Sequence, residues 1–153
     1  MINLMDTLLK RVNVECNLTP FQVLACSKTD GFMEFVPDSE TLQELIKRHG
    51  NLNDYFLKLS EPKIESTDEM RNEDEKKKFV NSNLTKLQEN FINSCAGYCV
   101  ITYLLGVGDR HKENLMVNKE GKFWHLDFGF ILGKDPKPYP PPFKLCSEMI
   151  EGR

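Results

Sequence analysis

The sequence predicts an α+β fold in which helices and short antiparallel strands occupy separate stretches of the chain. Helices are predicted at 1–10, where apolar residues recur at helical spacing, and at 39–49, 52–59 and 84–105. Short strands are predicted at 21–27 and 32–36, and a hairpin by the two apolar runs 115–117 and 122–126. With 153 residues, 40% of them hydrophobic and 28% charged, the chain has enough apolar material for one globular domain or a large part of one.

The helix boundaries follow from capping residues and from apolar content. Ser39 is the predicted cap of the helix that Gly50 ends, and Gly106 follows the long helix at 84–105. The second half of that long helix is apolar on nearly all sides, which predicts a buried position in the middle of the domain. Its apolar run, 91–105, is too short to cross a bilayer, so no transmembrane segment is expected.

Charge and cysteine content exclude some classes of partner. Twenty Lys and Arg against 23 Asp and Glu give a net charge of −3, so the chain has no bulk attraction for nucleic acid. The five cysteines contain no C-x-x-C pair, which favours a reducing, intracellular compartment. Residues 61–80 contain 12 charged residues in 20 and form either a solvated loop or a regulatory insert, and composition favours the loop.

The chemically informative residues lie after the buried helix. Asp109, His111 and Asn114 share one tight loop, and Asp127 stands at the far end of the hairpin that follows. Because a hairpin brings its two ends together, Asn114 and Asp127 are expected to meet. An amide oxygen beside a carboxylate suits Mg²⁺, which takes its remaining ligands from water and substrate phosphates. A nearby Asp or His that accepts a hydroxyl proton completes the parts of a phosphoryl-transfer site.

Neighbouring residues have simpler interpretations. Arg110 is favoured as an anchor of the loop over a phosphate contact. Trp124 is expected to pack in the core. His125 either supports Asp127, with which it alternates onto one strand face, or is an ordinary core histidine.

Protein kinases carry H-R-D-L-x-x-x-N and then D-F-G, whereas this chain has Asp109-Arg110-His111, Asn114 and Asp127-Phe-Gly. In this order the motifs resemble the phosphatidylinositol 3-kinase/4-kinase superfamily. The stretches NSCAGYCVITYLLGVGDRH, HLDFGFILGKDPKPYPPPFKL and SEMIEG are most similar to its class III phosphatidylinositol 3-kinases. Phe130 follows the D-F-G, where class I relatives carry a second histidine.

The resemblance implies a partial protein-kinase-like fold. Residues 1–36 would be the C-terminal part of the N-lobe with the hinge, and residues 37–153 a partial C-lobe. The C-lobe would include the charged insert 61–80, the catalytic loop 106–115 and the activation loop 127–148. A phosphate-covering loop and its lysine would precede Met1, so the sequence is expected to be an internal fragment that is inactive on its own.

The resemblance also implies the role of each site residue. Asn114 and Asp127 would bind Mg²⁺, or alternatively Mn²⁺. His111 would activate the inositol hydroxyl or stabilise transferred charge, and Asp109 would position the loop and the hydroxyl. The Glu34 carbonyl and the Val36 amide would bind the adenine of ATP. The activation-loop cations that would face the acceptor are Lys134, Lys137 and Lys144.

The implied reaction, in a longer enzyme, is ATP-dependent phosphorylation of the inositol 3-hydroxyl of phosphatidylinositol. The product would serve membrane trafficking and autophagy, with the enzyme peripheral on endosomal, vacuolar or autophagic membranes and bound to regulatory protein subunits. Two alternatives stand beside it. One is another kinase of the superfamily, acting on the 4-hydroxyl or on protein Ser/Thr, and the other is a truncated, non-catalytic chain.

Overall fold

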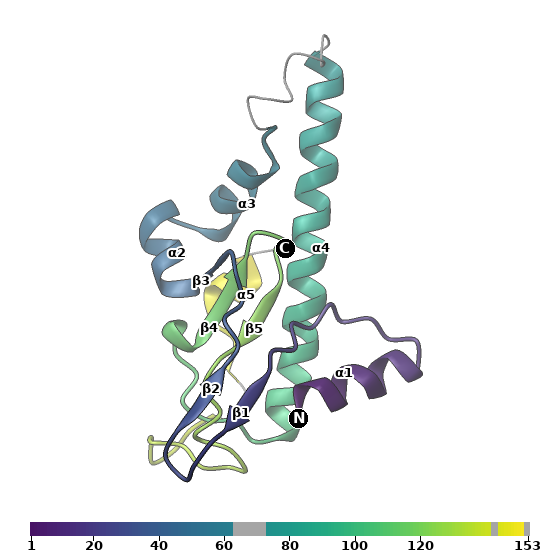
Figure 1. Cartoon of the computed structure of the whole chain (residues 1–153). Helices are drawn as coiled ribbons and strands as arrows, with labels where there is room; N and C mark the ends of the chain where they lie inside the picture. Colours follow the sequence, from purple (N-terminus) through teal and green to yellow (C-terminus); the bar gives the residue numbers. More distant parts are fainter. Residues whose placement is uncertain (63–72, 142–143, 152–153) are drawn as a thin grey trace.

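The computed structural model has a mixed α/β architecture with two small antiparallel sheets, which confirms the predicted class (Figure 1). It describes residues 1–62, 73–141 and 144–151. Its helices are α1 (Ile2–Arg11), α2 (Leu42–His49), α3 (Leu52–Ser60), α4 (Glu73–Leu104), the 3-10 helix η2 (Lys112–Asn114) and α5 (Ser147–Glu151). Its strands are β1 (Val23–Ala25), β2 (Gly31–Met33), β3 (Ser39–Thr41), β4 (Leu115–Asn118) and β5 (Phe123–His125).

The 32-residue helix α4 packs against α3 and β5 (Figure 1). Its buried side chains include Leu87, Phe91, Cys95 and Tyr98, which are spaced at three or four residues and therefore form one stripe. Phe91 contacts Phe56 of α3 edge-on, with ring centroids 5.6 Å apart. The predicted burial of this helix is therefore confirmed along one face, whereas Val100, Tyr103 and Leu104 near its C-terminal end are exposed.

The hairpin β4–β5 packs against this stripe. Phe123 of β5 meets the Phe91 ring edge-on at 5.7 Å, and its backbone N–H donates to the buried Ser94 hydroxyl over 2.9 Å. The turn of the hairpin also touches α4, because a Cβ on Gly121 would lie 2.4 Å from the Leu87 carbonyl oxygen. Gly121 has φ +79°, so this position requires glycine both for its conformation and for its close approach to the helix.

Two predicted boundaries are wrong. Thr41, not Ser39, caps α2 by accepting from the Glu44 amide over 3.2 Å, because residues 39–41 form strand β3, which pairs with β4. The long helix begins at Glu73 instead of residue 84, so residues 73–80 of the charged insert are helical. Glutamate and lysine are good helix formers, and the acidic first turn complements the helix dipole. Residues 63–72 of the predicted loop lie outside the described part of the chain.

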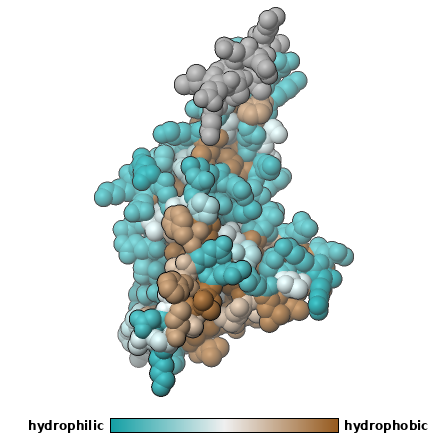
Figure 2. All heavy atoms as spheres, in the orientation of Figure 1, coloured by the Kyte–Doolittle hydropathy of each residue, from teal (hydrophilic) through white to brown (hydrophobic). Residues whose placement is uncertain are grey.

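The N-terminal elements expose much of their apolar surface. β1 and β2 pair antiparallel and are shorter than predicted, and both strands are exposed along their length. Figure 2 shows apolar side chains gathered in the lower half of this face, where Figure 1 places these strands. The exposed apolar residues of this region are Val23, Leu24, Phe32, Met33 and Phe35.

No helix within the described residues is long and apolar enough to cross a membrane.

Candidate functional site

The loop that follows α4 is hydrogen-bonded along its length to the segment that follows the D-F-G. Three backbone bonds join the two segments, from Leu132 N to Leu105 O (2.8 Å), from Gly133 N to Gly106 O (2.9 Å) and from Gly108 N to Phe130 O (2.8 Å). The predicted catalytic loop and the predicted activation loop therefore lie side by side, although more than 20 positions separate them.

Both backbone polar groups of Asp109 are hydrogen-bonded. Its N–H donates to Asp135 Oδ2 over 2.9 Å, and its carbonyl accepts from Asn114 Nδ2 over 3.1 Å. Its φ of 52° lies in the left-handed region, which is uncommon for a residue other than glycine and persists where the surroundings enforce it. These bonds fix the start of the loop and orient the Asn114 amide.

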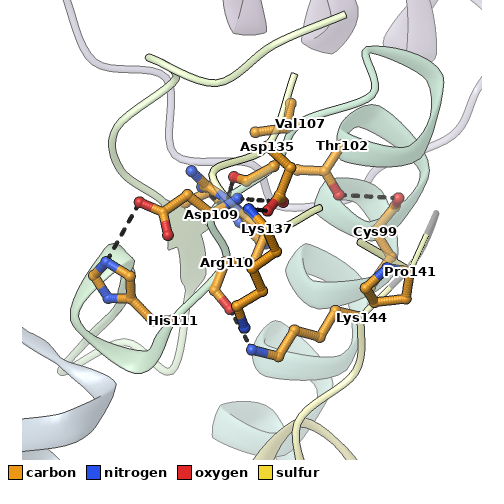
Figure 3. A pocket seen from close by; sticks show the side chains of 12 residues that line it. Cys99, Thr102, Val107, Asp109, Arg110, His111, Asp135, Lys137, Pro141 and Lys144 are labelled. Atoms are coloured by element: carbon orange, nitrogen blue, oxygen red, sulfur yellow. Dashed lines mark hydrogen bonds and ion pairs between the residues drawn. The ribbon is translucent and has the colours of Figure 1, made fainter. Parts of the chain in front are cut away.

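His111 stands between two carboxylates at the surface of the site. Its Nε2 lies 3.8 Å from Asp109 Oδ2 (Figure 3). Its Nδ1 lies 3.8 Å from Glu113 Oε2. These separations exceed direct hydrogen bonds. The imidazole is 45% exposed, so an incoming hydroxyl can reach it.

The hairpin brings Asn114 next to the D-F-G in the backbone, as its geometry predicts. The N–H of Leu126 donates to the Asn114 carbonyl over 2.9 Å, which places Asp127 one residue beyond this bond. Asp127 also has a left-handed backbone, with φ 54°, and its Oδ1 accepts from the Gly129 amide over 2.9 Å. That bond orients an exposed carboxylate at the end of the hairpin.

The Arg110 side chain links the catalytic loop to the end of the hairpin. Its Nε donates to the Gly108 carbonyl over 2.6 Å and its Nη1 to the Leu126 carbonyl over 2.9 Å, while Nη2 donates to the Asp127 carbonyl. Burial lowers the pKa of the guanidinium, and the nearby carboxylates, with Asp127 first, oppose that shift. These contacts support the interpretation of Arg110 as a structural anchor.

His125 is a buried member of the same cluster. Its Nδ1 lies 3.2 Å from Arg110 Nη1, and its ring stacks on Tyr98 with centroids 5.7 Å apart. Burial, followed by the charge of Arg110, lowers the pKa of His125 to about 3. At neutral pH the ring is therefore uncharged, and Nδ1 accepts from Arg110. His125 supports the anchor beneath Asp127 and is also a core histidine, which unites the two predicted interpretations.

The donor chemistry of Asn114 and Asp127 fits magnesium. The Asn114 Nδ2 is engaged by the Asp109 carbonyl, which leaves the amide oxygen as the ligand atom, and Asp127 supplies a carboxylate. In the part of the chain that the structure describes, no three His, Cys, Asp or Glu side chains converge as a metal cage. A metal held here would draw its other ligands from water and nucleotide phosphates, as Mg²⁺ does.

Of the two predicted adenine contacts, Glu34 is hydrogen-bonded to a residue that lines a pocket, and Val36 packs against the hydrophobic core. A cavity lined by residues that include Met1, Gln22, Val23 and Phe128 separates α1 and β1 from the D-F-G phenylalanine. Gln22 exchanges hydrogen bonds with Glu34, since Glu34 N donates to Gln22 O and Gln22 N donates to Glu34 Oε2, both over 2.8 Å. The segment assigned to adenine is thus tied to one wall of this pocket, while its role as a hinge stays a prediction.

The three activation-loop lysines are arranged differently from one another. Lys137 and Lys144 line a pocket with Asp109, Arg110 and His111, whereas Lys134 lines a separate one beside Gly106 and Pro140. Lys144 Nζ donates to the Arg110 carbonyl over 2.7 Å (Figure 3).

Asp135, which the sequence motifs do not single out, is bonded to the catalytic loop through the backbone N–H of Asp109. The Asp135-Pro136 pair signals only a local turn, in which aspartate accepts from the amide two residues on. Asp135 Oδ1 does so from Lys137 N over 2.8 Å.

Comparison with known proteins gives a consistent result. Residues 1–152 match the family model described as phosphatidylinositol 3- and 4-kinase. The chain is 45% identical to the nodule isoform of phosphatidylinositol 3-kinase from Glycine max and to phosphatidylinositol 3-kinase VPS34 from Arabidopsis thaliana, in both cases over 99% of the chain and 17% of the relative. It is also 45% identical to phosphatidylinositol 3-kinase VPS34 of Saccharomyces cerevisiae, over 98% of the chain and 15% of that protein. The chain thus spans less than a fifth of the length of these relatives.

Proposed function

The chain belongs to the phosphatidylinositol 3- and 4-kinase family, and from this premise we propose that the enzyme containing it transfers the γ-phosphoryl group of ATP to the 3-hydroxyl of phosphatidylinositol. The main support for this proposal is that two segments of the chain are hydrogen-bonded to each other. The loop with Asp109, His111 and Asn114 is hydrogen-bonded to the segment that bears Asp127. This arrangement supports a site in which His111 would accept a proton and Asn114 and Asp127 would supply an amide and a carboxylate, as phosphoryl transfer requires.

Each side chain then has one task. Asn114 and Asp127 would hold Mg²⁺, or Mn²⁺ in its place, which when bound neutralises the charge of the nucleotide phosphates. His111, exposed beside the Asp109 carboxylate, would accept the proton of the attacking inositol hydroxyl. Asp109 would orient that hydroxyl and keep the loop in place, and Arg110 would keep Asp127 and the loop in register.

The two substrates would approach from different sides. ATP would enter the pocket between β1 and Phe128, with its adenine toward Glu34 and Val36. The inositol headgroup would lie over the pocket lined by Lys137 and Lys144, with Lys134 as a further cation on the same loop. The boundary between the lobes near residue 36 belongs to this proposal.

The names of the relatives support the choice of acceptor and of hydroxyl. Relatives named phosphatidylinositol 3-kinase VPS34 support phosphatidylinositol as the acceptor and phosphorylation at the 3-position. We extend the proposal to an enzyme peripheral on endosomal, vacuolar or autophagic membranes, bound to regulatory subunits, whose product serves trafficking and autophagy. The proposed partners do not include nucleic acid.

The test is a lipid kinase assay on the full-length enzyme. Vesicles containing phosphatidylinositol and labelled ATP should yield phosphatidylinositol 3-phosphate, identified by chromatography against the 4-phosphate, and chelation of Mg²⁺ should abolish the signal. Formation of the 4-phosphate, or labelling of a serine peptide with no lipid product, would replace the proposal with another kinase of the family. Absence of any transfer would favour a non-catalytic chain.

A further inference from the structure

One carboxylate outside the predicted catalytic residues bridges the two loops of the site. Asp135 Oδ2 accepts the backbone N–H of Asp109 over 2.9 Å, and Asp135 Oδ1 accepts the backbone N–H of Lys137 over 2.8 Å. The first bond reaches across 26 positions to the catalytic loop, and the second closes a turn within the activation loop. Each oxygen therefore serves a different loop.

The packing around this carboxylate leaves no space for a side chain at position 108. A Cβ on Gly108 would lie 2.4 Å from the Lys134 carbonyl oxygen and 2.6 Å from Asp135 Oδ2. Only glycine allows the catalytic loop to approach Asp135 this closely. The adjacent backbone bond from Gly108 N to Phe130 O keeps the segments together at the same point.

Asp109 is the residue that this contact controls. Its left-handed backbone costs free energy, and its N–H and carbonyl are the two groups by which the surroundings hold it. The carbonyl bond goes to Asn114, a proposed metal ligand, so a shift of the Asp109 peptide moves Asn114 as well. Asp135 thus acts on two proposed site residues through one backbone bond.

We propose that Asp135 is a positioning residue that sets the geometry of the catalytic loop by holding the Asp109 peptide, and so couples the conformation of the activation loop to catalysis. The inference rests on the proposed kinase function. In this role both carboxylate oxygens of Asp135 accept from backbone amides, although the side chain also borders the pocket proposed for the headgroup. The amides of Lys137 and then Asp109 lower the pKa of Asp135, so the carboxylate is ionised at neutral pH and accepts both bonds as a charged group.

The test compares three variants of the full-length enzyme. Asp135→Asn retains one acceptor oxygen, so it makes only one of the two bonds, and Asp135→Ala makes neither. Asp54→Asn removes a charge of the same kind from the first turn of α3 and is the matched control. Rates on phosphatidylinositol vesicles are measured with kcat and KM resolved for ATP and lipid, together with the melting temperature of each variant.

Misplacement of a catalytic group acts on kcat, so we expect kcat to fall about 10-fold in Asp135→Asn and about 100-fold in Asp135→Ala. Both KM values should stay within about twofold of wild type. Asp54→Asn should retain wild-type kcat.

Three results would overturn the inference. The first is an unchanged kcat in Asp135→Asn, and the second is a rise in the lipid KM without a fall in kcat. The third is a loss of rate that is absent at assay temperatures below the melting temperature of the variant, because such a loss would come from unfolding. If Asp135→Ala does not fold, the Asp135→Asn variant still decides the question. A wild-type enzyme without phosphatidylinositol kinase activity would contradict the proposed function, whereas an active wild type with an equally active Asp135→Asn variant contradicts only this inference.

Discussion

Arg110 shows why the centre of the D-R-H motif suits arginine better than lysine. Its guanidinium reaches the carbonyls of Gly108, Leu126 and Asp127, which belong to both sides of the site. A planar fork of five N–H donors can serve these acceptors together, whereas a lysine ammonium on a flexible stem cannot do so in one geometry. Arg110, which the sequence favours as an anchor over a phosphate contact, therefore serves to assemble the loop.

At the same scale, Asp127 and His111 should differ in their effect on turnover. Asp127→Ala removes the proposed charged metal ligand and should abolish detectable transfer in the full-length enzyme. His111→Ala removes proton transfer, which contributes about 10²–10⁴-fold in typical enzymes, so a residual rate should remain. Lipid kinase assays of both variants give the order. Near-normal turnover of His111→Ala would transfer the role of base to Asp109.

His125 makes stability depend on pH. Burial holds the pKa of folded His125 near 3, against 6.5 for an ordinary histidine. Between these two pH values the unfolded chain binds a proton at His125 and the folded protein does not. Its contribution is therefore complete above about pH 6.5 and is lost as the pH falls toward 3. Between pH 7 and pH 5 the free energy of unfolding should fall by about 2 kcal/mol on account of this residue.

The measurement is urea unfolding of wild type and His125→Gln at both pH values. Glutamine still accepts from Arg110 but does not titrate, so the drop between pH 7 and pH 5 should be smaller in the variant by about 2 kcal/mol. An equal drop in the two proteins would show that His125 is not held neutral.

At the scale of elements, periodicity predicts the helices better than it predicts their ends. The helices predicted at 39–49 and 52–59 correspond to α2 and α3, whose buried residues include Leu42, Leu45, Leu52 and Phe56. β3 could not be predicted, because Ser-Glu-Thr has no apolar residue and forms a strand only by pairing with β4 far along the chain. The start of α4 was missed because a dense run of charge has the composition of a loop as well as of an exposed helix.

The same division applies to the candidate site. The motif spacing predicted Asp109, His111, Asn114 and Asp127 as a group, because all four lie at fixed positions around one hairpin. The bond from Asp109 to Asp135 depends on how two loops pack, which local sequence does not encode.

The anchoring of the hairpin to α4 can be tested at Ser94. This hydroxyl is fully buried, donates to the Asn90 carbonyl over 2.6 Å and accepts from the Phe123 amide over 2.9 Å. Ser94→Ala leaves that buried N–H without its partner, so the free energy of unfolding should fall by about 1–3 kcal/mol. Ser82→Ala, at an exposed position of the same helix, is the control and should change it by less than about 0.5 kcal/mol. Equal effects of the two substitutions in urea unfolding would contradict the anchoring role.

At the scale of the whole molecule, substrate choice depends on how few cations face the acceptor. The chain has a net charge of −3, and its predicted activation loop carries three lysines with Asp135 among them. Lys144 is committed to the Arg110 carbonyl, and Asp135 to the backbone of both loops. Each additional phosphomonoester on an inositol ring adds about −1.5 to −2 charge at pH 7 and requires its own charge-assisted contacts.

The full-length enzyme should therefore prefer phosphatidylinositol to its bisphosphate. The prolines at 136, 138, 140, 141 and 142 restrict the loop backbone, which limits its rearrangement to recruit other cations. One unmet charge-assisted contact costs about 1.5–3 kcal/mol, so the rate on the bisphosphate should be at least about tenfold lower. Vesicles of the two lipids, matched in surface charge with phosphatidylserine, separate headgroup recognition from nonspecific attraction to the membrane. Comparable rates on both would mean that Lys134 and Lys137 suffice to hold the extra phosphates, and the preference argued from this loop would fail.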